Sequence, residues 1–187
     1  MAEDRSDPDD FLVDRDEAYF EDEGKLRRPP RAFDAGLLRE PPAVLPARKP
    51  IVLSRHASVT DAMRAMQSEH RGAVLVTRDG TPGTEVVGIF TERDVLFRIV
   101  DGGRNPAVLP VGEVMTAEPE CIEEDQSLAE LLELMSVGGF RHVPVVDGAG
   151  RPLQTVSVRD VVQFLVESFP REVLNQGSDR TRTREGG

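Results

Sequence analysis

Apolar and polar positions follow a pattern that occurs twice along the middle of the chain. SVTDAMRAM (58–66) superposes on SLAELLELM (127–135) at an offset of 69 residues, and the same offset brings AVLVT (73–77) onto HVPVV (142–146). The first pair has the apolar spacing of an amphipathic helix, and the second pair has the short apolar runs typical of buried strands. Each unit is predicted as a short strand, a helix, two strands joined by a Gly-rich turn, and a closing helix. The pattern therefore predicts two βαββα units.

Each unit also has a strand that ends in a hydroxyl residue, two further residues and an aspartate. GIFTERD (88–94) contains Thr91 and Asp94, and TVSVRD (155–160) contains Ser157 and Asp160. This spacing is a variant of the capping box that begins helices. The same atoms also suit a ligand, because a carboxylate accepts hydrogen bonds from the two vicinal hydroxyls of a ribose while the helix N-terminus faces a phosphate. From the turn alone, helix capping is the favoured interpretation.

The two units are expected to depend on each other and on a second chain. A half-domain of about 60 residues buries too little surface to be stable alone, so we expect the units to pair face to face around one core. The closing helix of the second unit is apolar over roughly 200°, which is more than one core needs. Its apolar residues are Val161, Val162, Phe164, Leu165, Val166 and Phe169. This surplus predicts a homodimer.

The net charge of −11 is concentrated at the N-terminus. Residues 1–23 hold eleven Asp and Glu and two Arg, whereas the remaining residues hold 23 acidic and 21 basic residues. The body lacks the basic excess that binds a nucleic-acid backbone, so no nucleic acid is expected as a partner. No apolar run approaches the roughly 18 residues of a membrane span, and the acidic N-terminus does not have the pattern of a secretory signal. We therefore expect no membrane association and a cytoplasmic location.

The doubled pattern resembles a known family. Together with VMTAEP (114–119) and RHVPVVD (141–147), the order of elements and the two turns resemble a tandem pair of CBS domains, the Bateman module, over roughly residues 43–169. The resemblance implies an α/β (α+β) fold of two βαββα CBS repeats, packed as one pseudo-twofold Bateman module. It also implies a dimeric regulatory module whose clefts bind adenosine-containing ligands such as AMP, ADP, ATP or S-adenosylmethionine, without catalytic activity of its own.

The resemblance divides the chain into four parts. Residues 1–42 are expected to form an acidic, Pro-rich and largely disordered leader, since closely spaced prolines favour an extended connector. CBS repeat 1 is expected over 43–104 and CBS repeat 2 over 105–170. Residues 171–187 are polar and are expected to form a disordered tail.

The resemblance shifts the interpretation of the two turns toward ligand binding. It implies that Asp94 and Asp160 bind ribose and that Thr91 and Ser157 lie near the phosphate. Arg141 and His142, which precede a predicted strand, are candidates for binding phosphate, although a solvated arginine and a histidine at a strand edge explain them equally well. The candidate site residues are therefore Thr91, Asp94, Arg141, His142, Ser157 and Asp160.

The two repeats depart from the family pattern in different places. Gly72 and Ala73 align with the basic pair of the second repeat, and His70 and Arg71 come two positions too early, so their reach to a ligand is in question. Gln154 stands where the first turn has the glycine that the family prefers, and its side chain is expected to crowd a base or sugar at the second turn. The sequence does not decide which turn binds a ligand.

The sequence contains none of the common enzyme active-site motifs considered below. The chain lacks a G-x-S-x-G elbow, a Walker A loop and a G-x-G-x-x-G turn after a strand. Its three histidines lack metal-ligand spacing and Cys121 is the single cysteine, so no metal site is predicted, although Mg²⁺ would accompany a bound triphosphate. We expect a non-catalytic module that needs no cofactor, binds an adenine nucleotide and signals its occupancy to an unknown regulated protein. The alternatives are a structural dimerisation or protein-interaction module with degenerate pockets, or a module that binds S-adenosylmethionine or NAD.

Overall fold

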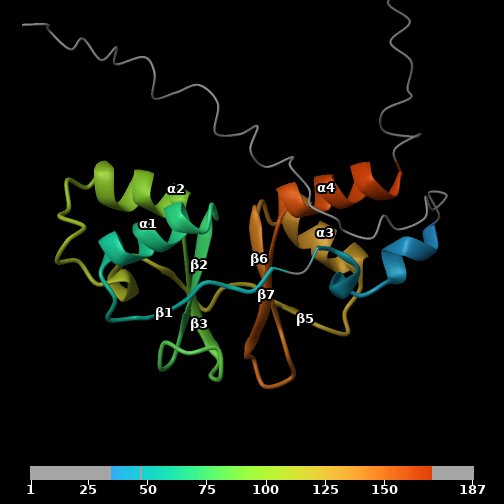
Figure 1. Ribbon diagram of the computed structural model, residues 1–187, viewed down its shortest axis with the longest axis horizontal. Helices are drawn as coiled ribbons and strands as arrows, with labels where there is room; N and C mark the ends of the chain where they lie inside the picture. Colours follow the sequence, from blue (N-terminus) through green and yellow to red (C-terminus); the bar gives the residue numbers. More distant parts are fainter. Residues whose placement is uncertain (1–34, 47, 170–187) are drawn as a thin grey trace, which may run out of the picture.

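The computed structural model describes residues 35–46 and 48–169, which form two units that lie side by side (Figure 1). The expected tail and most of the expected leader therefore lie outside the described residues. Each unit has one sheet with helices packed against it, and the predicted βαββα order is confirmed in both repeats.

The first unit contains a four-stranded sheet in the order β1-β2-β3-β4. β1 and β2 are parallel, and the other two pairings are antiparallel. The last strand comes from the connection between the repeats, which the sequence pattern did not predict. The elements of this unit are β1 (Val52–Ser54), α1 (Val59–Ser68), β2 (Ala73–Thr77), β3 (Val86–Thr91), α2 (Glu92–Asp94) with its π-helical continuation (Val95–Val100), a 3-10 turn (Val111–Glu113) and β4 (Thr116–Ala117).

The second unit contains a three-stranded sheet in the order β5-β6-β7. β5 and β6 are parallel, and β6 and β7 are antiparallel. Its elements are β5 (Ile122–Glu123), α3 (Leu128–Ser136), β6 (His142–Val146), β7 (Pro152–Ser157) and α4 (Val158–Ser168).

All four α-helices within the described residues begin with a capping box. The N-cap hydroxyl accepts a hydrogen bond from the N3 backbone N–H, and the N3 carboxylate accepts one from the N-cap backbone. The four pairs are Ser58–Asp61, Thr91–Asp94, Ser127–Glu130 and Ser157–Asp160. The box is thus the general way in which this chain begins a helix, and its presence alone does not indicate a ligand.

The apolar core is divided between the repeats. One cluster fills each unit, with Phe90 fully buried in the first and Leu131 in the second. A small third cluster, formed by Ala73, Leu75 and Ile89, occupies the other face of the first sheet. The structure therefore does not have the single shared core that the sequence suggested. Each repeat has its own core, and the third cluster is separate because alternate side chains of a strand point to opposite faces of the sheet.

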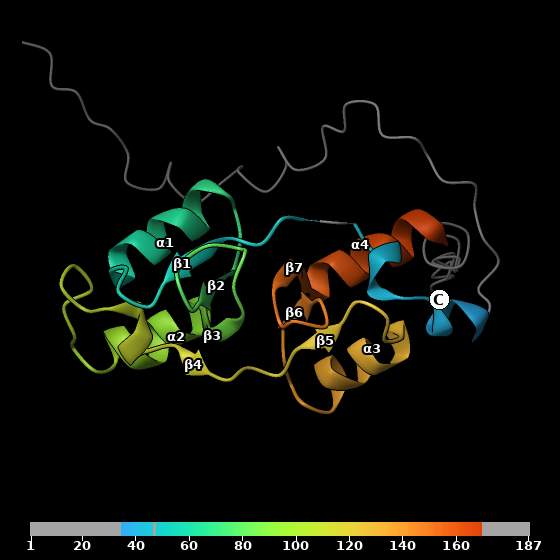
Figure 2. The same ribbon diagram turned by 90° about the horizontal axis from the view of Figure 1, so that it is seen from below.

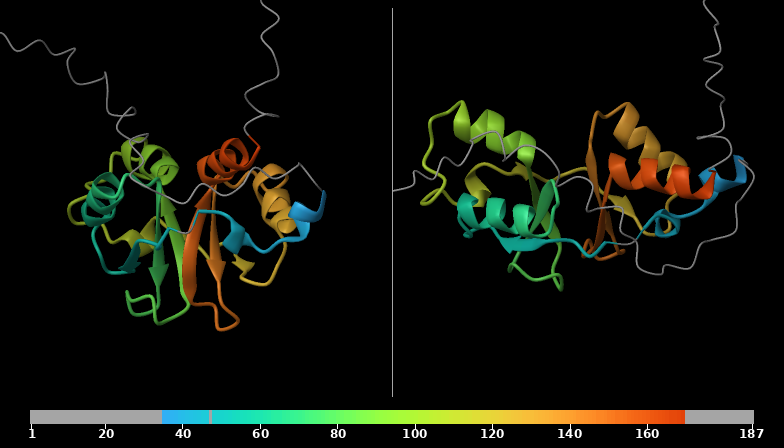
Figure 3. Two further views of the ribbon diagram at one scale, coloured as in Figure 1. Left: turned by 45° about the vertical axis from the view of Figure 1, so that its right-hand side comes forward. Right: turned by 45° about the horizontal axis from the view of Figure 1, so that its top comes forward.

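The sheets of the two units meet in the middle of the molecule. β2 and β3 lie next to β6 and β7, and the helices lie away from this contact (Figure 3). The backbone N–H of Val86 donates to the Gly150 carbonyl oxygen at 2.9 Å, which joins the two repeats at one end of the sheets. The structural elements that face each other across this contact also position the site described below.

An N-terminal arm, residues 35–45, packs against the second repeat rather than the first. It contains two 3-10 helices (Ala35–Arg39 and Pro42–Val44), and it lies beside α3 and α4 (Figure 2). Leu37 and Leu45 are buried in the core of the second repeat, and the Leu128 N–H donates to the Glu40 carbonyl at 2.7 Å. The boundaries expected at residues 42 and 104 stay predictions, but the contacts show that each repeat is completed by a segment from outside its expected range.

Candidate functional site

A cavity of about 370 Å³ lies between the two repeats at the N-terminus of α4. It is lined by Arg48, His70, Arg71, Gly72, Ala73, Glu92, Arg141, His142, Thr155, Ser157, Val158, Arg159 and Asp160. The cavity therefore combines the second turn and the start of β6 with residues from the start of β2 in the other repeat. A ligand in it would contact both repeats at once.

In the second turn, the two carboxylate oxygens of Asp160 have different surroundings. Asp160 Oδ2 accepts hydrogen bonds from the Ser157 backbone N–H at 2.8 Å and from its hydroxyl at 2.6 Å. Asp160 Oδ1 is buried and has no hydrogen-bond partner among the described residues, although the Nε of Arg48 lies 3.2 Å away without the alignment of a hydrogen bond. Since a buried carboxylate oxygen without a hydrogen bond is costly, this atom is an acceptor that a ligand hydroxyl would satisfy.

The cavity lining is rich in positive charge. Four arginines and two histidines line it, against two carboxylates, those of Glu92 and Asp160. Arg71 crosses from the first repeat, and its guanidinium donates to the Thr155 carbonyl oxygen of the second repeat at 3.4 Å. Burial lowers the pKa of Arg71, and the positive charge of Arg48 lowers it further. Guanidinium groups arranged in this way suit the oxygens of a phosphate.

His142 stands at the meeting point of the repeats. Burial lowers its pKa, the carboxylate of Asp160 acts in the opposite direction, and Arg71 and Arg141 lower the pKa further. A Cβ added at Gly72 of the first repeat would lie 2.9 Å from His142 Cε1. The absence of a side chain at Gly72 therefore creates the space that the imidazole of the second repeat occupies.

The first turn has the same capping geometry, but its Thr91 and Asp94 do not line this cavity, and of this turn only Glu92 does. Asp94 Oδ2 accepts from the Thr91 N–H and hydroxyl, both at 2.8 Å, and Oδ1 lies 3.2 Å from Arg98 Nε. Arg98 also donates to the Val114 carbonyl oxygen at 2.6 Å and to the Thr116 hydroxyl at 3.1 Å. The outer oxygen of Asp94 thus faces a guanidinium that is held in place by two further hydrogen bonds.

The structure brings together four of the six candidate residues, Arg141, His142, Ser157 and Asp160, and leaves Thr91 and Asp94 outside the cavity. His70 and Arg71 do reach the cavity, although their early position in the sequence had put this in question. Gln154 does not line it, because its buried amide donates to the Pro42 carbonyl oxygen of the N-terminal arm at 3.3 Å. The expected crowding at the second turn is therefore not found.

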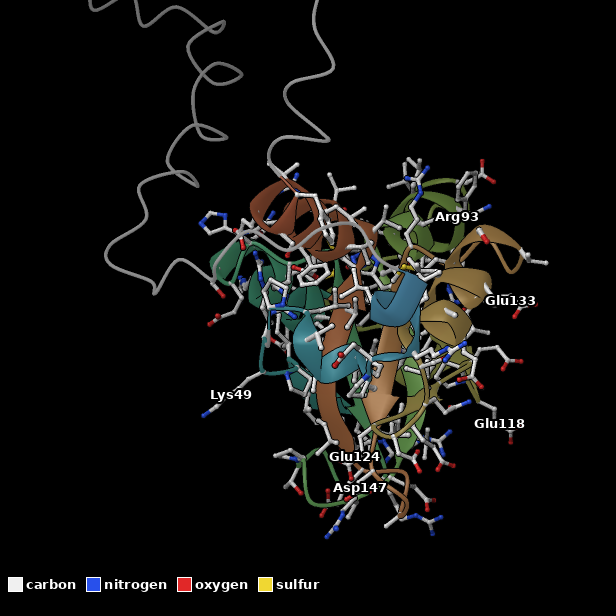
Figure 4. All side chains as sticks on the ribbon, turned by 90° about the vertical axis from the view of Figure 1, so that its right-hand side faces the viewer. Lys49, Arg93, Glu118, Glu124, Glu133 and Asp147 are labelled. Atoms are coloured by element: carbon white, nitrogen blue, oxygen red, sulfur yellow. The ribbon has the colours of Figure 1, made fainter. Side chains whose placement is uncertain are left out.

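The cavity lining also includes Arg48, Glu92 and Arg159, none of which is among the six candidate residues. Arg48 lies just before β1, and no residue pattern distinguishes it from the other basic residues of that connection. Arg93, by contrast, lies outside the cavity and projects from the end of its helix (Figure 4), where its guanidinium stands 5.6 Å from the centre of the Phe97 ring.

No group of three or more potential metal-ligating side chains occurs within residues 35–46 and 48–169. The described helices are also too short or too polar for any of them to cross a membrane. Burial raises the pKa of the Cys121 thiol to about 11, with a smaller contribution from Glu120, so this thiol is protonated at neutral pH.

Comparison with known proteins agrees with the geometry. The family model of the CBS domain matches twice, over residues 43–101 and 111–167. The chain belongs to the CBS-domain family. A curated relative, the mitochondrial CBS domain-containing protein CBSX3 of Arabidopsis thaliana, is 32% identical over 118 residues, which are 62% of this chain and 56% of that protein. The chain thus spans little more than half the length of this relative.

Solved CBS structures share the fold. A CBS domain protein from Pyrobaculum aerophilum, complexed with AMP, has a TM-score of 0.58 and 24% identity, covering 67% of this chain and 94% of that one. The CBS domain pair of protein MJ0100, in complex with 5-methylthioadenosine and S-adenosyl-L-methionine, has a TM-score of 0.55 and 20% identity, covering 66% and 96%. The fold of this chain is therefore that of a CBS pair.

Proposed function

We propose that this CBS pair is a non-catalytic regulatory module that binds an adenine nucleotide in the cavity between its repeats. One observation carries the proposal: a single cavity combines the buried Oδ1 of Asp160, which accepts no hydrogen bond from the described residues, with a lining in which arginines outnumber carboxylates. The AMP complex and the S-adenosylmethionine complex of similarly folded proteins support an adenosine-containing ligand in general.

Different residues of the cavity lining suit the ribose and the phosphate of a nucleotide. The ribose hydroxyls donate to Asp160, whose Oδ2 stays engaged in capping α4 while Oδ1 accepts. The phosphate lies toward Arg71, Arg141 and His142, and the N-terminus of α4 adds a favourable dipole. Mg²⁺ would accompany a triphosphate, whose oxygens supply its ligands.

The charge of the lining favours a phosphorylated ligand over S-adenosylmethionine. Four arginines face two carboxylates, and a sulfonium cation gains nothing from this surplus of positive charge. AMP, ADP and ATP carry the complementary charge, and NAD carries part of it. Among the adenosyl ligands, the nucleotides are therefore the preferred candidates.

Signalling would follow from the shared lining of the cavity. A ligand that contacts Arg71 of the first repeat and Asp160 of the second favours one mutual orientation of the repeats. It transmits a signal only to the extent that its affinity differs between orientations. We propose further that the module acts on a separate regulated protein in the cytoplasm.

Thermal-shift and calorimetric titrations with AMP, ADP, ATP, NAD and S-adenosylmethionine test the proposal. A ligand at a hundred times its Kd should stabilise the fold by about 2.7 kcal/mol. Asp160→Asn should reduce this stabilisation to about half or less, whereas Asp61→Asn should retain it, because Asp61 caps α1 with the same geometry but does not line the cavity. Absence of any ligand-induced shift, or equal behaviour of the two variants, would contradict the proposal.

A second role, dimerisation, is favoured by a different observation. Apolar side chains are exposed along the π-helical continuation of α2 and along α4, which lie on the same side of the molecule (Figure 1). They are Leu96, Phe97, Val100, Val158 and Val162, with exposed fractions between 43% and 66%. Exposed apolar surface of this kind marks an interaction site, and we propose that a second copy of the chain covers it. This role is compatible with nucleotide binding.

A further inference from the structure

We infer that each chain holds one ligand, at the second turn, and that the first turn is a structural clasp that fixes the connection between the repeats. The inference rests on the proposed function for its ligand, but the clasp can be tested without any ligand. Its basis is the different surroundings of two turns that have the same capping geometry.

The two aspartates differ in how firmly the arginine beside their Oδ1 atom is held in place. Each Oδ1 lies 3.2 Å from an arginine Nε, that of Arg98 for Asp94 and that of Arg48 for Asp160. Arg98 is anchored by two more hydrogen bonds, whereas Arg48 makes none that the described residues show and itself lines the cavity. A ligand hydroxyl can therefore displace Arg48 toward a phosphate, but displacing Arg98 would also break its other two bonds.

Arg98 links the first turn to the chain that leads into the second repeat. Its guanidinium reaches Asp94, the Val114 carbonyl oxygen and the Thr116 hydroxyl, and Thr116 begins β4. β4 in turn pairs with β3, the strand that ends in Thr91. The turn, the helix and the connection are thus joined in one closed set of contacts. We call this set, Asp94, Arg98, Val114 and Thr116, the clasp.

The space beside the first turn is filled by the same connection. A Cβ added at Gly88 would collide with the side chain of Met115, so this glycine accommodates a methionine that lies between two members of the clasp. At the second turn the matching position, Gln154, points to the N-terminal arm instead. The glycine that the family prefers is therefore used here for packing.

The charged residues near the two turns also favour a ligand at the second turn. Arg141 and His142 of the second repeat correspond to Gly72 and Ala73 of the first, so a basic pair faces only one of the two positions. Glu118 precedes β5 as Arg48 precedes β1, each by four residues, and Glu118 lies on the surface (Figure 4). An anionic ligand is thus favoured at the second turn and not at the first.

Calorimetric titration of the full chain with AMP tests the number of sites. We expect one AMP per chain, a loss of affinity of about tenfold or more for Asp160→Asn, and a Kd within about threefold of wild type for Asp94→Asn. Two equivalents of AMP per chain would overturn the inference, as would a tenfold loss in an Asp94→Asn variant that retains its circular dichroism spectrum.

The clasp has its own test in the ligand-free protein. Asp94→Asn and Arg98→Ala should each lower the Tm by roughly 2–4 °C, and the double variant should lower it no further than the larger single effect, since both changes open the same contacts. Asp160→Asn combined with Arg98→Ala should instead be additive and serves as the control. Additive losses for Asp94→Asn and Arg98→Ala would refute the clasp. If no adenosyl ligand binds, the proposed function fails and the one-site claim fails with it, while these Tm values still decide the clasp.

Discussion

Replacing Gly72 by alanine should reveal whether the repeats are fitted to each other at the cavity. The new Cβ would lie 2.9 Å from His142 Cε1, 3.0 Å from Nε2 and 3.2 Å from Glu92 Oε2. Carbon atoms in contact normally lie about 3.5–4.0 Å apart, so the imidazole must move by about half an ångström or more. Glu92 is exposed and can move away, but the largely buried ring of His142 cannot do so freely.

The expected cost follows from overpacking. Forcing an extra methyl group into a packed region typically costs about 1–3 kcal/mol, and the reduced freedom of the unfolded chain returns about 0.4–1 kcal/mol. Gly148→Ala is the matched control, because a Cβ there meets nothing within 4 Å and should only stabilise. The free energy of unfolding, measured by urea denaturation, should therefore be about 1–3 kcal/mol lower for Gly72→Ala than for Gly148→Ala.

A double-mutant cycle identifies the cause. In a His142→Ala background the clash is absent, so Gly72→Ala should no longer destabilise the protein, and the coupling free energy should be about 1–3 kcal/mol. If Gly72→Ala resembles Gly148→Ala, or if its cost persists without the imidazole, then the repeats do not meet at this residue as described.

Three further predictions concern the arm, the imidazole and the apolar surface. Leu45→Ala should lower the free energy of unfolding by about 2–5 kcal/mol, because Leu45 is fully buried in the second repeat; a loss below about 1 kcal/mol would mean that the arm is not part of that core. Since burial lowers the pKa of His142, the unfolded chain binds a proton more readily than the folded one, and stability should be fully present above the unfolded pKa of about 6.5 and decline as the pH falls through the folded pKa. His142→Gln should flatten the dependence of Tm on pH between about 7.5 and 5, and an unchanged slope would argue against a buried neutral imidazole. Phe97→Glu should convert a dimer to a monomer in light scattering without loss of helical circular dichroism, whereas a wild-type monomer would remove the dimer proposal.

The repeat and its turns could be predicted because they depend on local spacing. The offset of 69 residues locates both repeats, and the spacing of Ser157 and Asp160 predicts a capped helix from local sequence alone. The π-helical continuation at Val95–Val100 was not predicted, since its residues are compatible with an ordinary α-helix. The fate of Gln154 was likewise unpredictable, because its partner lies 112 residues away on the N-terminal arm.

Two related units, the starting points of their helices and the likeness of their two turns can be read from the order of residues alone. Folding adds that Leu45 completes the second core, that Arg71 reaches across to the other repeat, and that the second turn lines a cavity while Arg98 pairs with the aspartate of the first turn. The physical reason is the range of the interactions. Caps and periodic apolar faces arise between residues a few positions apart, whereas the space beside each aspartate is set by segments that the fold brings from far along the chain.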